Sequence, residues 1–445
     1  MIKAGDDLTL HRRELMSLIA ALSLAAVAGP SAFAADAKGA WGARNARDLL
    51  VSGQAWDEFC DTLKTAAKVV DRFGNDIDDH DRAEWYRFLT RCMRWGFERF
   101  VENSDAARPL LMPFPWRVTI NVTTPDQDHY FFDYFDTAKD YVIAGNRGTT
   151  PYFVIAVLTQ MRPTDFATRN WAAAGIDGLK EYDQAIEKTT HFLSSDQMTF
   201  APNGDFEIQV SRHKKQGNWL QLDPDSTWIL VRAVHHERAK EISPTFKISP
   251  AKPVAPSRAT PEQMTAALVE TGQLVLGYAN LLRLWWQDDL GQRLNRLRFS
   301  KSLYLTNGGV NDREFAFGAW KKSRDEALVF QFTPPEADYW ILQMCNIWQE
   351  NLDNYEEGRG RLNKFMAKAE LDGSILAVFA DQDPGMGGNW IDSGGWTKGI
   401  MGLRFIRTKG APEVKSYLVP LKELRRKGRK LLTPDNAIAS GETTE

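Results

Sequence analysis

The stretch Gly388-Asn389-Trp390-Ile391 has a counterpart in the first half of the chain, Gly217-Asn218-Trp219-Leu220. A second pair of matching segments lies further along the chain. Gly402-Leu403-Arg404 follows the motif at 388–391, and Leu230-Val231-Arg232 follows the motif at 217–220 at a similar distance. One matching tetrapeptide could arise by chance, but several matches in the same order indicate an internal repeat. The sequence therefore predicts two related modules.

Three further pairs of segments extend this correspondence toward the N-terminal side of each motif. Ile120 to Phe135 corresponds to Leu303 to Trp320, Tyr152 to Ile155 corresponds to Tyr339 to Leu342, and Asn203 to Ile208 corresponds to Asp372 to Leu376. These segments combine β-branched and aromatic residues with flanking turn residues, which is typical of β-strands. We therefore expect a β-sandwich in each half, with one strand of the first half at residues 118 to 122.

Helical periodicity precedes the strands in each half. Residues 45 to 72 and 79 to 103 carry apolar residues at three- and four-residue spacing, and a long amphipathic segment covers about residues 261 to 296. One more helix is expected near residues 171 to 193, among the strands of the first half.

The expected fold class is α+β, with two related modules that each pack a helical element on an antiparallel, jelly-roll-like β-sandwich. The first module is expected at residues 40 to 248 and the second at residues 261 to 415. Residues 249 to 260 hold several prolines and are the expected linker. Residues 416 to 445 are expected to form a basic, solvated C-terminal tail.

The composition indicates a folded chain with more than one packed unit. At 445 residues it exceeds the size at which a single core stops growing, and 43% hydrophobic with 25% charged residues is ordinary for globular proteins. The formal net charge of −3 provides no field that would hold nucleic acid. We expect a small molecule as the partner, and a homo-oligomer is compatible with this sequence.

Residues 1 to 34 have the pattern of an export signal that is cleaved after Ala34. Arg12 and Arg13 precede an apolar run that ends at Gly29, and small residues occupy the cleavage positions. The paired arginines favour the twin-arginine route, with the general secretory route as the alternative. No other stretch approaches the roughly 18 apolar residues that span a bilayer. The sequence therefore predicts a periplasmic protein without a transmembrane segment.

Motifs of the common cofactor-dependent enzymes are absent from the sequence. It contains no dinucleotide fingerprint, phosphate-binding loop, nucleophile elbow, zinc-protease helix or haem c attachment motif. Cys60, Cys92 and Cys345 lack the close spacing of metal sites, although Cys60 and Cys92 could either bridge two helices or remain buried thiols. We therefore expect no cofactor.

Several of these segments resemble the domain of unknown function 1214 family. The resemblance is carried by residues 380 to 385, 389 to 395 and 399 to 404, and in the first half by residues 140 to 149 and 217 to 220. It implies an exported bacterial protein with β-sandwich modules, similar to the long members of that family. The sequence departs from the family pattern at Trp396, where a histidine often follows the glycine pair.

The segment from Pro125 to Tyr130 holds the densest set of chemically active side chains. Asp126, Asp128, His129 and Tyr130 could supply a base, an acid and a hydrogen-bond donor from one loop. Here Asp126 or Asp128 is the expected base and His129 or Tyr130 the expected proton donor. A solvated turn in which aspartates cap backbone amides is the alternative.

Three arginines are candidate anion anchors, because a guanidinium group holds a carboxylate or phosphate through two parallel hydrogen bonds. Arg147 is expected to orient a substrate. Arg232 and Arg404 occupy matching positions of the repeat, which favours a structural salt bridge for both.

The tryptophan motifs could bound a ligand pocket. Trp219 and Trp390 are candidate stacking platforms, with Asn389, Asp383 and Asp392 as polar neighbours. The alternative is structural, since an asparagine can close a turn and a tryptophan can fill the end of a sandwich.

A metal site is a further alternative. If the strand that begins at Trp228 extends far enough, His235 and Glu237 share one face and could join His213 as ligands. The spacing matches no established ligand motif, so pairing of these residues with Arg238 and Lys240 is the competing expectation.

These features lead to three functional hypotheses. The first is an exported enzyme that performs cofactor-independent acid/base chemistry of lyase, hydratase or isomerase type on a hydrophobic or ring-bearing small molecule. The second is a periplasmic protein that binds a glycan or lipid without catalysis. The third is a metal-assisted hydrolase that uses His213, His235 and Glu237.

Overall fold

The fold is that of a computed structural model, which describes most of the chain. The described residues are 45–74, 77–113, 126–132, 136–160, 187–255, 258–301, 304, 313–352 and 360–438. The expected export signal and the expected strand at 118 to 122 lie outside these residues. Among the described helices, none combines the length and apolar character that a bilayer span requires.

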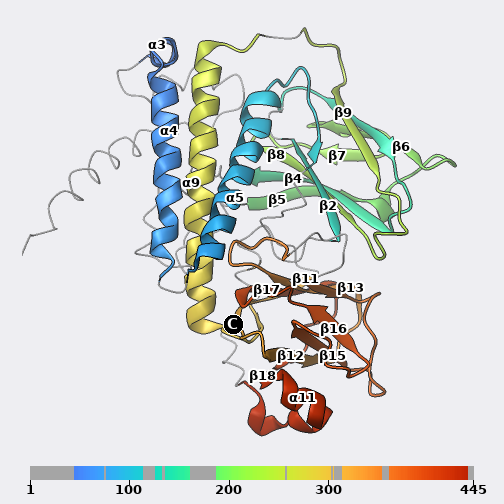
Figure 1. Cartoon of the computed structure of the whole chain (residues 1–445). Coiled ribbons are helices and arrows are strands. Elements are labelled where there is room, and N and C mark those ends of the chain that lie inside the picture. Colours follow the sequence, from blue (N-terminus) through green and yellow to red (C-terminus); the bar gives the residue numbers. More distant parts are fainter. Residues whose placement is uncertain are drawn as a thin grey trace, which may run out of the picture.

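Four helices form one layer of the molecule (Figure 1). They are α3 (Ala46–Val51), α4 (Gln54–Ala67), α5 (Asp79–Gly96) and α9 (Pro261–Gln292). Short 3-10 and π segments continue α4 and α5 to Arg72 and Glu102. Capping boxes begin α5 at Asp78 and α9 at Thr260, where the cap side chain accepts a hydrogen bond from the third residue of the helix. The helices expected at 45 to 72, 79 to 103 and 261 to 296 are thus confirmed.

The first half of the chain forms two sheets that share one core. The first five-stranded sheet has the order β1 (Met112–Pro113), β2 (Gln127–Phe132), β8 (Trp228–Val234), β4 (Tyr152–Gln160) and β5 (Glu187–Ser194). The first four-stranded sheet has the order β7 (Trp219–Gln221), β6 (Asp205–Ser211), β3 (Tyr141–Asn146) and β9 (Thr245–Pro250). Phe153 and Val231 of the first sheet pack with Ile143 and Ile208 of the second, so the two sheets form a sandwich.

The second half forms another such pair. The second five-stranded sheet has the order β10 (Arg298–Phe299), β11 (Arg313–Lys321), β17 (Lys398–Thr408), β13 (Ala337–Cys345) and β14 (Arg361–Asn363). The second four-stranded sheet has the order β16 (Asn389–Asp392), β15 (Ile375–Ala380), β12 (Glu326–Phe332) and β18 (Lys415–Pro420). Each half thus orders its strands in the same way along the chain, and β6–β7 and β15–β16 are parallel where the other pairs are antiparallel.

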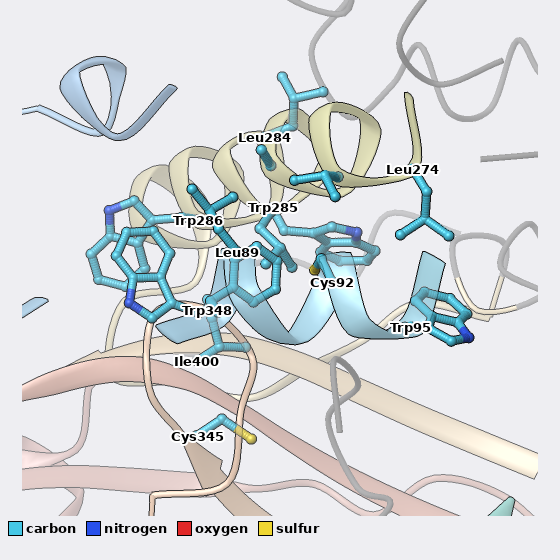
Figure 2. Close-up of a cluster of buried hydrophobic side chains, with 14 of the residues drawn as sticks. Leu89, Cys92, Trp95, Leu274, Leu284, Trp285, Trp286, Cys345, Trp348 and Ile400 are labelled. Carbon is cyan, nitrogen blue, oxygen red and sulfur yellow. The ribbon is translucent and has the colours of Figure 1, made fainter. Parts of the chain in front are cut away.

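The outer faces of both five-stranded sheets pack against the helical layer. Phe131 and Leu230 of the first sheet belong to the same buried cluster as Phe317 and Ile400 of the second, together with the tryptophans of α5 and α9. Figure 2 shows Trp285 and Trp286 on α9 and Trp95 on α5, with Cys345 and Ile400 on the strands beneath. The core of the molecule therefore joins the helices to both sandwiches.

Two segments differ from expectation. Residues 187–193 of the expected helix at 171 to 193 belong to strand β5, which pairs with β4. Cross-strand pairing decided their conformation, and the rest of that helix lies outside the described residues. At the C-terminal end, β18 pairs with β12 and α11 (Leu421–Lys427) buries Leu421 and Leu424 against the second four-stranded sheet. The second sandwich thus extends past residue 415 into the segment expected to be a solvated tail.

The three cysteines are free thiols in the structure. Burial raises the pKa of Cys92 and Cys345 well above the ordinary value, so both are protonated at neutral pH. They contribute to the core as small apolar side chains.

Replacement of Trp85 by alanine should destabilise the protein strongly. Trp85 on α5 is fully buried, packs against Phe73 and Trp348, and donates a hydrogen bond to the carbonyl oxygen of Ala67. Loss of such a side chain costs about 3–5 kcal/mol. The neighbouring Tyr86 is 55% exposed on the same helix, and we expect Tyr86→Ala to change the free energy of unfolding by no more than about 0.5–1 kcal/mol.

Guanidinium-induced unfolding of both variants measures the difference. Equal destabilisation by the two substitutions would contradict the shared core described above.

Candidate functional site

Strand β2 carries most of the predicted catalytic residues, and it is buried rather than solvated. Successive side chains of a strand point to opposite faces. Gln127, His129 and Phe131 point to the outer face, where Phe131 joins the helical core. Asp128 and Tyr130 point toward the interior of the first sandwich. The four predicted side chains therefore separate into different environments, and the alternative of an exposed turn is wrong.

Asp126 ties the two sandwiches together. Its Oδ2 accepts hydrogen bonds of 2.7 Å from both the Tyr339 hydroxyl and Nδ2 of Asn363, and its Oδ1 lies 3.1 Å from Nε of Arg361. All three partners belong to the second sandwich, and Asp126 is buried. Burial, together with the charge of Asp126, raises the pKa of Tyr339 well above its ordinary value. This carboxylate is therefore committed to joining the sandwiches.

Asp128 is committed to a second network, at the end of the first sandwich. Its Oδ1 accepts from Arg238 at 2.7 Å, and its Oδ2 accepts from Nε2 of His235 at 2.8 Å and from the Ser243 hydroxyl at 2.6 Å. The other nitrogen of His235 lies 3.1 Å from Oε2 of Glu241. Both ring nitrogens of His235 thus face carboxylate oxygens, which fixes the orientation of the ring.

The partners of Asp128 control its ionisation. Burial alone would raise the pKa of Asp128, but the hydrogen bond from His235, the charge of Arg238 and the hydrogen bond from Ser243 outweigh it and hold the pKa well below its usual range. An aspartate that is held ionised in this way is a weak base. The network instead fastens the β8–β9 connection to β2.

His129 lies at the junction of the two five-stranded sheets. It pairs with Arg232 in the β2–β8 register, and its Nε2 lies 3.0 Å from Oε1 of Gln127. Burial first, and then the positive charges of Arg232 and Arg404, lower its pKa well below the ordinary value. His129 is therefore neutral at pH 7, with one ring nitrogen as donor and the other as acceptor.

Arg404 approaches the same junction from the second sheet. It is 8% exposed, and its guanidinium lies over the Phe315 ring with 4.9 Å between the guanidinium carbon and the ring centroid. Burial lowers its pKa to about 10, and the charges of Arg313 and Arg232 act in the same direction, so it is still charged at pH 7. We use the name inter-sheet cluster for these residues: Gln127, His129, Arg232, Arg313, Tyr339 and Arg404.

The expectation of a salt bridge for Arg404 is wrong. No described residue accepts a hydrogen bond from its guanidinium or pairs with it as a carboxylate, and its Nε is buried without a partner. The physical reason is the position of the side chain on the outer face of β17, where the facing residues of the other sheet and of β11 include further arginines rather than acids.

Two of the predicted catalytic residues lie elsewhere. Tyr130 packs against Phe246 inside the first sandwich, and burial raises its pKa to about 12. Arg147, at the end of β3, places its guanidinium over the Phe200 ring at 5.1 Å. Neither side chain belongs to the inter-sheet cluster.

The asparagines of the two tryptophan motifs perform matching structural roles. Asn218 exchanges hydrogen bonds with the backbone N–H and carbonyl of Thr199, and its Nδ2 also donates to Glu207. Asn389 does the same with Lys368 and donates to Leu376. Both asparagines thus pin a neighbouring segment to the start of an edge strand.

The remaining candidates for substrate binding are on the four-stranded sheets. Trp390 is 40% exposed and donates from Nε1 to the carbonyl of Ala380, while Trp219 donates to Ser211. Asp383 and Asp392 accept hydrogen bonds from the backbone of Gly385 and Gly394 within turns. The core of the second sandwich separates β16 from the outer face of β17. The structure therefore does not bring these residues to β2.

The candidate metal ligands do not converge. His213 is exposed in the β6–β7 connection, Glu237 pairs on the surface with Lys240, and His235 is enclosed by Asp128 and Glu241. Within the described ranges, no three His, Cys, Asp or Glu side chains are grouped so that they could share a metal ion.

Sequence reasoning missed Arg313, Tyr339, Arg361 and Asn363 as neighbours of the β2 residues. Tyr339 lies 213 residues and Asn363 lies 237 residues from Asp126 along the chain, and only sandwich packing brings such residues together. The one usable signal was the matching position of Arg232 and Arg404 in the repeat, which places both on central strands.

The fold has a counterpart of known structure. A crystal structure of an uncharacterized protein from Burkholderia cenocepacia shares 27% sequence identity with this chain, with a TM-score of 0.75 over 85% of this chain and 100% of that chain. A protein from Vibrio parahaemolyticus shares 12% identity, with a TM-score of 0.40 over 73% of this chain and 95% of that chain. No protein-family model and no curated protein matches the sequence. The comparison with the Burkholderia protein supports a mixed fold of helices and antiparallel sheets.

The Asp128 network should make stability depend on acid pH. A carboxyl group whose pKa is lowered in the folded state stabilises fully above its unfolded value of about 3.9, and the contribution is lost as the pH falls through the folded value. We expect Asp128→Asn to be less stable than the wild type by about 3–5 kcal/mol at pH 7. The difference should stay constant down to about pH 5 and shrink below about pH 4.

Urea unfolding from pH 7 to pH 2 measures this dependence. Asp383→Asn, which removes an exposed turn carboxylate, is the matched control. A stability difference for Asp128→Asn that persists undiminished at pH 2 would contradict an ionised Asp128.

Proposed function

We propose that this protein performs cofactor-independent acid/base chemistry on a hydrophobic or ring-bearing small molecule at the inter-sheet cluster. The observation that carries the proposal is the position of His129, a neutral imidazole buried where the outer faces of two sheets and a set of arginines meet. Buried ionisable groups with perturbed pKa values are concentrated at functional sites. His129 is the proton carrier in this proposal.

The surroundings of these side chains favour His129, rather than Asp126 or Asp128, as the proton carrier. Asp126 and Asp128 each accept hydrogen bonds or ion pairs from three side chains, so proton uptake would break a structural network. His129 is neutral because of burial and nearby arginine charge. A negatively charged substrate beside the ring would offset that charge and raise the pKa of His129 toward neutrality, where proton transfer is most effective.

We further infer that the two sandwiches are duplicated modules and that the chain is an exported, periplasmic member of the domain of unknown function 1214 family. The identical strand order of the halves supports the duplication. The matching side-chain contacts of Asn218 and Asn389 support it independently. The signal-like pattern of residues 1 to 34 and the family-like motifs at residues 380 to 404 support the other two inferences.

Binding without catalysis is the second candidate function. Arg404 favours it, because an unpaired buried cation can hold a ligand whether or not a proton is moved. In that case His129 contributes only shape and a hydrogen bond.

Removal of His129 distinguishes the two functions. We expect wild-type protein, incubated with a periplasmic extract, to deplete one compound and produce another, as measured by untargeted mass spectrometry. His129→Ala should slow the conversion by about 100-fold or more, which is typical for loss of a general acid or base. His191→Ala is the matched control, since His191 is half-buried and pairs with Asp223 away from the cluster.

Conversion at the wild-type rate by His129→Ala would contradict the proposal. Retention of a compound without conversion by the wild type would favour binding.

A further inference from the structure

We infer that the inter-sheet cluster binds the carboxylate of a small organic acid with an apolar body, and that the guanidinium of Arg404 is its anchor. The inference names the substrate class of the site proposed above and rests on that proposal for the location of the ligand. It also holds if the ligand is bound without being converted.

The first argument is the missing partner of Arg404. A buried guanidinium is costly unless a carboxylate or other acceptors compensate for the lost water. Arg404 is more than nine-tenths buried, its Nε has no acceptor, and it forms no ion pair with any described residue. The Phe315 ring compensates in part through a cation–π contact. A ligand carboxylate would supply the missing acceptors, because its two oxygens match the two N–H groups of a guanidinium edge.

The second argument is another buried hydrogen-bond donor that has no acceptor. This donor lies on the facing sheet. Nε2 of Gln127 is buried without a hydrogen-bond partner, while Oε1 of the same side chain faces His129. The two unsatisfied groups therefore come from opposite sheets, and both are donors. Two unsatisfied donors that come from facing sheets favour a ligand that brings acceptor oxygens, such as an anion.

The third argument is the local charge. Arg232 and Arg313 both act on Arg404 in the direction that lowers its pKa, so they are close enough to repel it. Two carboxylates next to the cluster in sequence are already engaged: Asp126 by Arg361, Tyr339 and Asn363, and Asp128 by Arg238, His235 and Ser243. An anion bound beside Arg404 would offset the effect of these two charges on its guanidinium.

The apolar body of the ligand follows from the neighbours of Arg404. Phe315 stacks with Tyr304 at 5.7 Å and with Phe317 at 4.2 Å between ring centroids, and all three rings are buried. On the same face of β17, the residue two positions before Arg404 is Gly402, whereas Leu230 occupies that position before Arg232 in β8. The aromatic rings and the glycine beside Arg404 favour a ligand whose body is a ring or an alkyl group over a ligand with a polar, hydrated body.

The stability of the ligand-free protein distinguishes a ligand anchor from a structural arginine at position 404. An arginine that held the sheets together would destabilise the protein when replaced. An anchor that waits for a ligand carries an uncompensated desolvation cost, so its replacement by an apolar side chain of similar length is neutral or stabilising. We expect Arg404→Met to have an unfolding midpoint equal to or above that of the wild type.

The experiment measures thermal unfolding and calorimetric binding of the full chain with benzoate, 4-phenylbutyrate and hexanoate, each matched with its neutral amide, and with inorganic phosphate. We expect at least one carboxylate to bind the wild type and its amide to bind at least about 30-fold more weakly. Arg404→Met should weaken carboxylate binding by a similar factor, and Arg404→Lys by less. Arg324→Met, at an exposed arginine that pairs with Asp381, should leave the affinity unchanged.

Three binding results would overturn the inference: no Arg404-dependent binding of any carboxylate, equal binding of acid and amide, or inorganic phosphate binding as tightly as the best carboxylate. Destabilisation of the ligand-free protein by Arg404→Met would also overturn it. The proposed chemistry is tested separately. Carboxylate binding through Arg404 without any His129-dependent conversion refutes the chemistry alone, and conversion that survives Arg404→Met refutes the anchor alone.

Discussion

One constraint organises the molecule: both faces of each five-stranded sheet must be shielded from water. The inner faces pack on the four-stranded sheets, and the outer faces carry large apolar residues such as Phe131 and Phe317. The four-stranded sheet of each sandwich covers only the inner face of its five-stranded sheet, so each outer face has to be covered by another part of the chain. The helices α5 and α9 lie over both, and the two sheets also meet directly through Val234, Tyr339 and Ile406. Folding of one half is thus linked to the other through a shared core.

The inter-sheet cluster is one place where this shared burial is polar. Apolar side chains, many of them tryptophan, phenylalanine and leucine, fill the shared core, whereas cations and an amide join the aromatic rings near Arg404. A core that only had to be stable would use apolar residues there, because well-packed hydrophobic replacements of buried charges are usually at least as stable. Polar groups that break the local rule without internal compensation are typical of sites selected for binding or chemistry.

The aspartates of β2 illustrate how packing reassigns residues that look catalytic. Asp126, Asp128 and His129 lie close together in sequence, yet their roles differ. Asp126 joins the two sandwiches, Asp128 fastens the β8–β9 connection, and His129 belongs to the inter-sheet cluster. Successive side chains of a strand point to opposite faces, which separates residues that are neighbours in sequence. The partners that other strands supply then decide the ionisation of each group. Of the three, His129 is the one whose pKa burial and arginine charges lower, so that it is neutral at pH 7.

The sequence by itself determined the helices at 45 to 72, 79 to 103 and 261 to 296, because their apolar spacing and capping residues are local properties. It also indicated a β-rich arrangement in each half, since the ordered motifs recur along the chain. Only the tertiary structure decided that residues 187–194 form a strand and that β18 continues the second sandwich, because pairing with distant strands overrides local preference. The inter-sheet cluster likewise depends on contacts across more than a hundred residues, which local patterns do not encode.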